Sequence, residues 1–211
     1  GTVDVADAAL VQSVDQYDAV DSDYDIEDSA GAILSDTGTI LNQGVDDVFV
    51  NDPYGAYYYG DNDDVNAQTG LELNVLEDQL QSLNGTGSDV VFDVEDSASA
   101  IATALDGDSS RLGNAEEVDV EGGTVDVADA GVIQSVTNYD SGDSFYTISD
   151  SSSSILDETG TILDQGVDFV DVTDTVDAAT GLQLNHLESQ KKNAAFTCSN
   201  GGHYNLSLIH N

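Results

Sequence analysis

The chain has 211 residues, with 42 Asp and Glu against 3 Lys and Arg, so its formal charge is −39. Too few cationic side chains are present to neutralise a row of phosphates, which excludes a nucleic-acid partner of the usual kind. No apolar run approaches the ~18 residues of a membrane span, so we expect no membrane insertion. The single Cys excludes a disulfide framework within the chain, and because Met is absent we expect a fragment of a longer protein.

A long repeat organises most of the chain. Residues 1–52 align without a gap with 123–174; GTVDVADAALVQSV, for example, matches GTVDVADAGVIQSV. The first copy then carries an inserted loop, 53–64, after which VNAQTGLELNVLED matches VDAATGLQLNHLES. The pattern predicts one repeat array over 1–190. Its predicted parts are the long repeats 1–84 and 123–190, joined by a linking segment, 88–122.

Inside the long repeat lies a shorter motif, in which two apolar residues alternate with other residues and an Asp follows. It appears in chain order as VDVADA, YDIEDS, VFVNDP, FDVEDS, VDVADA, YTISDS and VDVTDT, with neighbours about 21 to 24 residues apart where no insertion intervenes. The alternation predicts a short strand with one apolar face. The Asp falls at the strand-to-helix junction, where a carboxylate accepts hydrogen bonds from the free N–H groups of the first helical turn. The predicted helix-capping residues, which are also possible calcium ligands, are Asp7, Asp28, Asp52, Asp96, Asp129, Asp150 and Asp174.

Each strand is followed by apolar residues at helical spacing, such as Leu10 and Val14 in the first repeat. Gly44 and Gly166 fall just before the next strand, as a turn requires. The longest helical candidate begins near Val65. Its predicted apolar side consists of Leu71, Val75, Leu76, Leu80 and Leu83.

The positions between the apolar strand residues are mostly polar, which distinguishes between two architectures. In a doubly wound sheet both faces are covered and strands are apolar throughout. Here one sheet face is expected to meet solvent, with helices on the other. We therefore predict an α/β fold: a repetitive strand–helix solenoid with one parallel sheet, right-handed crossovers and one exposed sheet face. The predicted acidic outer row on that face is Asp4, Asp25, Asp93, Asp126 and Asp171.

If the repeats stack in register, equivalent carboxylates lie about 4.8 Å apart and repel by roughly 0.9 kcal/mol in water. Cations would relieve this repulsion, and ligands that are almost all oxygens favour Ca²⁺ over transition metals. We therefore expect calcium as the cofactor. The segment from Asp21 resembles the start of an EF-hand loop, but Ile26 stands where Gly is required. An acidic surface adapted to high salt, without specific ion sites, is the alternative.

The inserted loop offers a different function. Its Tyr cluster, next to acidic residues, suits glycan stacking or other ligand contact on a protruding loop. A carbohydrate- or ligand-binding module is therefore a second hypothesis, and packing of the rings on the array is the structural alternative. The possible ligand-loop residues are Tyr54, Tyr57, Tyr58, Tyr59, Asp61, Asp63 and Asp64.

No catalytic pattern stands out, since neither a Gly-x-Ser-x-Gly nor a His-Glu-x-x-His motif is present. We therefore expect that the chain is not an enzyme. The last segment, 191–211, departs from the repeat pattern, and its string LSLIH looks like a translated sequencing adapter. We expect this tail to be artefactual or disordered.

The recurring V-x-V-x-D-[ST] motif, over about residues 1–190, resembles the repeats of very large bacterial cell-surface adhesins, S-layer-like proteins and secreted repeat proteins. The resemblance implies an extracellular, structural or adhesive segment on the cell surface. It implies that the partners are neighbouring repeats of the same polypeptide, with glycans or other surface proteins as further candidates. It transfers no individual binding residue, because the glycine-rich calcium nonapeptide of such secreted proteins is absent here.

Overall fold

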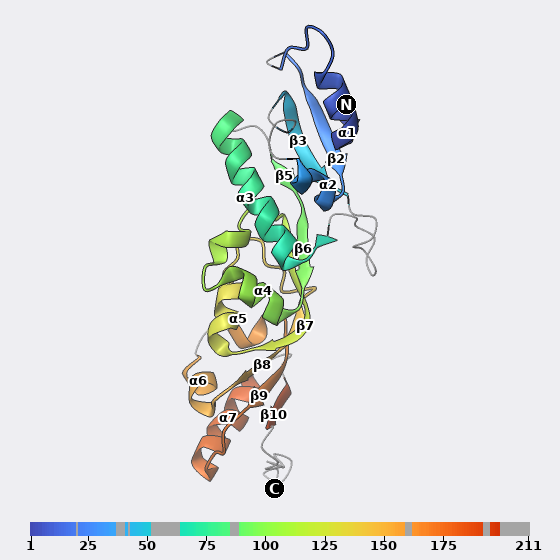
Figure 1. Ribbon diagram of the computed structural model, residues 1–211. Helices are drawn as coiled ribbons and strands as arrows, with labels where there is room; N and C mark the ends of the chain where they lie inside the picture. The colour runs from blue at the N-terminus through green and yellow to red at the C-terminus, as the bar shows by residue number, and fades with distance from the viewer. Residues whose placement is uncertain are drawn as a thin grey trace. The chain divides into compact units, whose positions relative to one another are not determined.

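The computed structural model describes residues 1–19, 21–36, 41, 43–51, 64–84, 89–158, 162–191 and 195–198. Strands and helices alternate along them, which confirms the α/β class (Figure 1). The described α-helices are α1 (Val5–Gln12), α2 (Ala30–Ser35), α3 (Ala67–Asn84), α4 (Ala98–Leu105), α5 (Val127–Ile133), α6 (Ser152–Asp157) and α7 (Ala178–Gln190). The described strands are β1 (Thr2–Val3), β2 (Tyr24–Asp28), β3 (Val45–Val50), β4 (Asp64–Val65), β5 (Val90–Val91), β6 (Asp93–Asp96), β7 (Glu117–Val125), β8 (Phe145–Asp150), β9 (Val167–Val172) and β10 (Ala195–Cys198).

The chain divides into two compact units. The first comprises 1–95 and 110–118, and the second comprises 96–109 and 119–211. Within the described residues the strands form two sheets, and every pairing whose register is known is parallel. The expectation of one common sheet is therefore wrong. No helix in the described residues combines the length and apolar character needed to cross a membrane.

In the first unit, strands of consecutive repeats lie side by side, in the order β1-β2-β3-β5. Val3 is level with Ile26, Ile26 with Val48, and Val48 with Val90. The expected neighbourhood of the first three repeats is therefore confirmed. The strand β4, which follows the inserted loop, does not continue this sheet but pairs with β6.

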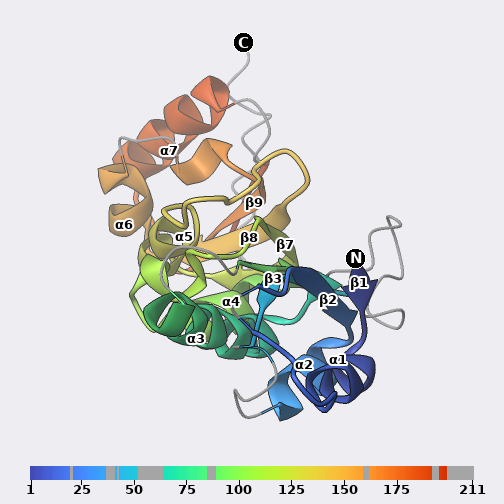
Figure 2. The same cartoon turned by 90° about the horizontal axis from the view of Figure 1, so that it is seen from above.

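The second unit repeats the arrangement in the order β10-β9-β8-β7. Val125 is level with Ile148, and Ile148 with Val170. Helices α5, α6 and α7 lie on one side of β8 and β9 (Figures 1 and 2). From Phe169 to Val172 of β9 burial alternates, since Val170 is fully buried while the neighbouring Phe169 is 49% exposed. This unit thus has one covered sheet face and one face that meets water.

The long helix α3 buries only part of the side that was expected. Leu76 and Leu80 are buried, together with Leu73, whereas Val75 is 53% exposed. Gly70 accounts for the difference, because a Cβ atom there would lie 2.6 Å from Cγ2 of Val94. Only a glycine lets the helix approach β6 this closely, and the side of α3 that includes Gly70 becomes the buried one.

Two further expectations concern segments outside the regular repeat. Of the tail, which was expected to be artefactual or disordered, Ala195–Cys198 forms β10, with Phe196 level with Val170 of β9. The inserted loop lies outside the described residues except for Asp64, the first residue of β4.

Candidate functional site

Most helices begin at a short polar side chain that accepts a hydrogen bond from the backbone N–H three residues further on. Such an N-cap stabilises a helix by about 1 kcal/mol, since it satisfies one of the free N–H groups of the first turn. The observed N-caps are Asp4, Ser29, Ser97, Asp126, Ser151 and Asp177. The first-turn N–H of Thr69 in α3 donates in the same way to Asn66 Oδ1, at 2.9 Å.

Asp7 and Asp129 are therefore not the caps of their helices, and the prediction is corrected for both. Each lies within the first turn and donates its backbone N–H to the true N-cap, Asp4 or Asp126, at 2.6 and 2.8 Å. The strand in these two repeats ends two residues earlier than the motif predicts, so that Val5 opens α1. In Asp129, partial burial and the negative charge of Asp126 raise the pKa of the carboxyl.

Two other predicted capping residues do bind helix N-termini, in a way that the sequence does not reveal. Asp28 Oδ1 accepts from the N–H of Ser29, at 2.7 Å, at the start of its own repeat. Its Oδ2 accepts from the N–H of Val5, the first residue of α1 in the preceding repeat, at 3.2 Å. Asp150 makes the same pair of contacts in the second unit. Its Oδ1 lies 2.6 Å from Ser151 N, and its Oδ2 lies 3.3 Å from Val127 N.

Asp174 also reaches back to the preceding repeat. Its two carboxylate oxygens accept from the backbone N–H of Ser152, at 2.6 Å, and from the Ser152 hydroxyl, at 2.8 Å. Ser152 is the first residue of α6. These two hydrogen bonds lower the pKa of Asp174. Asp96 accepts from Ser97 N at 2.7 Å, and the last predicted capping residue, Asp52, lies outside the described residues.

The predicted acidic outer row does not form as a ladder of equivalent aspartates. Asp4 and Asp126 are N-caps. The strands are displaced by two residues relative to the sequence alignment, so Asp25 stands opposite Thr2. Asp171 stands opposite Ser149 and Thr197 and accepts from both hydroxyls, at 3.3 Å each. In the registers known for the described strands, Asp93 of the predicted row stands opposite another acid, Asp64.

Carboxylates do gather at the starts of β2 and β3. Those near β2 belong to the segment that resembles an EF-hand loop, and the others lie on β3. A side-chain hydrogen bond links the carboxyl of Asp46 to that of Asp23. This hydrogen bond and the negative charge of Asp23, with smaller contributions from Asp47 and Asp25, raise the pKa of Asp46. The group is thus a place where the excess negative charge is locally unfavourable.

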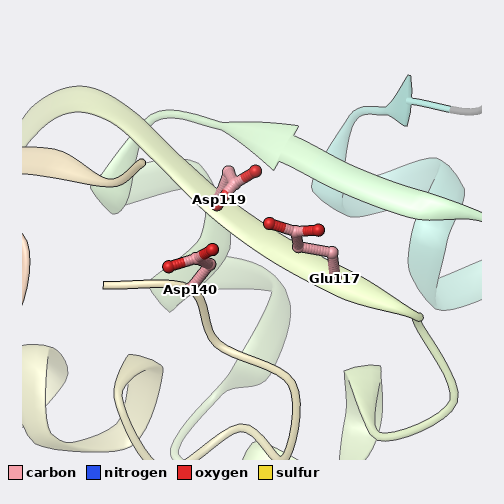
Figure 3. Close-up of side chains that lie close together, drawn as sticks. All are labelled: Glu117, Asp119 and Asp140. Atoms are coloured by element: carbon pink, nitrogen blue, oxygen red, sulfur yellow. The ribbon is translucent and has the colours of Figure 1, made fainter. Parts of the chain in front are cut away.

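A second group of acids joins β7 to the loop after α5. Glu117 and Asp119 are two residues apart on β7 and therefore project from the same side of the strand. Figure 3 shows that both side chains lie close to that of Asp140, which the loop carries. One carboxylate oxygen from each residue lies within 4.8 Å of the others.

This spacing fits a hard cation. Calcium–oxygen distances of about 2.4 Å place ligands on opposite sides of an ion about 4.8 Å apart. Three carboxylates supply three to six oxygens, and water completes a coordination number of six to eight. Glu117, Asp119 and Asp140 could therefore hold a metal ion. None of the three was a predicted site residue; the Glu-x-Asp spacing in EEVDVE was the available signal, but only the fold brings Asp140 to it.

One carboxylate is buried in the interior of the first unit. Glu77 of α3 is 6% exposed, and its Oε1 accepts from Gln81 Nε2 at 2.8 Å. Burial raises the pKa of Glu77 to about 7, with a smaller contribution from the charge of Asp89. It lies on the buried side of α3 that Gly70 selects, next to the backbone of Val90 in β5.

A cavity of about 550 Å³ lies beside the starts of α2 and α3 in the first unit. Its lining includes the carboxylates of Asp64, Glu72 and Glu95 together with small residues of α2, but no His, Cys or Lys. Asp64 is the one ligand-loop residue among those that the structure describes. The remaining ligand-loop residues, Tyr54, Tyr57, Tyr58, Tyr59, Asp61 and Asp63, lie outside the described residues.

No protein-family model, curated protein or solved structure matches the chain. What the chain does must therefore be inferred from its own residues and their geometry.

Proposed function

We propose that the chain is a non-catalytic structural or adhesive segment of a large extracellular repeat protein, with calcium screening its acidic surface. The observation that carries the proposal is the contact between repeats: Asp28, Asp150 and Asp174 each accept a hydrogen bond from the first residue of the preceding repeat's helix. On this proposal the partners are neighbouring repeats of the same polypeptide, in a right-handed solenoid at the cell surface.

The contact suits a load-bearing role because it makes each helix depend on the next repeat. A carboxylate at a helix N-terminus satisfies a free N–H and lies at the positive end of the helix dipole. Further polar contacts span consecutive repeats in the second unit. Gln134 Nε2 donates to the carbonyls of Ile162 and Gln165, at 2.8 and 3.1 Å, and the Tyr139 hydroxyl donates to Gln165 at 2.9 Å.

The negative charge of the chain is the reason why the proposal includes calcium. The formal charge of −39 opposes compaction, and the raised pKa of Asp46 marks one place where carboxylates crowd. The group Glu117, Asp119 and Asp140 offers only oxygen ligands, which Ca²⁺ prefers. A cation bound there would hold β7 and the loop after α5 together.

Thermal melting in CaCl₂ and in NaCl at equal ionic strength tests the proposal. We expect millimolar Ca²⁺ to raise the melting temperature beyond the effect of NaCl, since an ion that binds only the folded state stabilises it by mass action. Asp140→Asn should lose most of this increment. Asp168→Asn, which removes an exposed charge of β9, is the matched control and should keep it. Equal melting curves in the two salts would instead indicate a salt-adapted surface without specific ion sites.

A further inference from the structure

Equivalent helices in the two long repeats differ sharply in exposure. In α1, Val11 is 41% exposed, and Val14, just beyond the helix, is 62% exposed. Their equivalents 122 positions later are Ile133 of α5 and Val136, which are 0% and 4% exposed. The inner sides of both helices are equally buried, as Ala8 and Ala130 are each 0% exposed. The difference is therefore confined to the outer side.

In the second unit, α4 packs against α5. The helix α4 has the sequence ASAIATAL and carries no charged residue. Its own Ile101 and Leu105 are fully buried. In a chain with so much negative charge, an uncharged helix of small and aliphatic residues can approach α5 without electrostatic repulsion.

The surroundings of Gly123 differ from those of its equivalent in the first repeat in the same way. Gly123 has φ +87°, and a Cβ atom there would lie 3.1 Å from the backbone N of Ala98, the first residue of α4. Its equivalent is Gly1, where a Cβ would meet nothing within 4 Å. The glycine is thus required where the preceding helix lies against the strand.

The serine that precedes the second strand of each long repeat also differs in its hydrogen bond. The N–H of Val120 donates to the buried hydroxyl oxygen of Ser144 at 3.0 Å. The equivalent of Ser144 is Ser22, whose hydroxyl instead donates to the carbonyl of Asp18, at 2.6 Å, within its own loop.

We infer that the outer side of α1, with the edge of β1, is a docking surface for a further strand–helix repeat of the same chemistry as Asp93–Leu105. The docked repeat takes the place next to α1 that residues 89–122 take next to α5. Its uncharged helix covers Leu10, Val11 and Val14, and its first helical residue lies against Gly1. This inference rests on the proposed role as a repeat segment and names the partner of that segment's first helix.

The test adds a second copy of residues 89–122 directly in front of Gly1 of the full chain. In the chain that carries the added copy, amide hydrogen exchange in α1 should slow at least about tenfold, because local opening of α1 must now break the new contact. If amide exchange in α1 is as fast as in the original chain, the inference is overturned, whether or not the added copy folds. The calcium response of the original chain is a separate measurement, so failure here leaves the proposed function testable by itself.

Serine substitutions at equivalent valines give a second, internally controlled readout. In the original chain Val136→Ser should lower the melting temperature by several degrees (~4 °C), and Val14→Ser by less than about 1 °C, because only the first valine is buried. In the chain with the added copy, both substitutions should be costly. A Val14→Ser effect that stays small there overturns the inference. So does concentration-dependent association of the original chain that Val14→Ser abolishes, since a second copy would then be the occupant.

Discussion

The carboxylate of Asp150 accepts a hydrogen bond from the backbone N–H of Val127, the residue that opens α5 in the preceding repeat, at 3.3 Å. The same side chain also accepts from Ser151, at 2.6 Å, just before α6. One aspartate thus serves the N-termini of two successive helices. This dual contact explains why an Asp recurs at the end of the strand although it is not the N-cap of the helix that follows.

Replacing Asp150 should destabilise the second unit. We expect Asp150→Ala to lower the free energy of unfolding by about 1 to 2 kcal/mol, because two helix N–H groups lose their acceptor. Urea denaturation measures the change. Asp168→Ala is the control for removing one negative charge from a highly acidic chain, and it should be neutral or slightly stabilising. Equal effects of the two substitutions would mean that the hydrogen bonds of Asp150 add nothing beyond charge.

Glu77 should make the first unit less stable as the pH rises. Its pKa is raised by burial to about 7 from an ordinary value of 4.5, so between these values the folded state holds a proton that the unfolded state has lost. The free energy of unfolding therefore falls across this window, by at most about 3.4 kcal/mol. Glu77→Gln should remove this dependence and be more stable than the original chain at pH 8. Parallel pH profiles of the two proteins would contradict the assignment.

Asp174 should show the opposite dependence. The hydrogen bonds from Ser152 lower its pKa in the folded state, so its contribution to stability is complete above the ordinary Asp value of 3.8 and is lost as the pH falls through the lowered value. Carboxyl NMR titration measures the pKa directly. Ser152→Ala removes the hydroxyl donor and should raise the pKa of Asp174 toward its ordinary value. The carboxyl of Asp177, which a separate helix N–H and the Thr180 hydroxyl stabilise, should not respond.

A pair of glycine substitutions compares the two long repeats. Gly123→Ala should cost about 1 to 3 kcal/mol, because the residue has φ +87° and the new Cβ would lie 3.1 Å from Ala98 N. Gly1→Ala should have no measurable effect in the original chain. Differential scanning calorimetry of both variants tests the prediction, and a tolerated Gly123→Ala would show that α4 does not lie as close to β7 as described.

Much of the fold could be predicted because it depends on local patterns. Alternation along β2 and β8 predicts strands, and the spacing of the motif predicts that consecutive strands are neighbours. The details of the capping depend instead on register. Asp4 and Asp7 are both plausible caps in the sequence, and which one acts is decided by whether Val5 belongs to the strand or to the helix.

The acidic groups could be predicted less well, since they form from residues distant in sequence. The spacing of Glu117 and Asp119 is visible in the sequence, but the loop after α5 decides that Asp140 joins them. Likewise, Glu77 looks like a solvent-facing helical residue until the close approach at Gly70 turns that side of α3 inward. Backbone approach and loop path are set by the tertiary structure, and no single stretch of sequence contains them.

The claim that aspartates of one repeat hold the helix of the preceding repeat is tested most directly by amide hydrogen exchange, resolved at single residues. Val5, Val127 and Ser152 should be protected in the original chain, and each should lose protection selectively in Asp28→Ala, Asp150→Ala and Asp174→Ala, respectively. Exchange at the three positions that is unchanged by these substitutions would contradict the account.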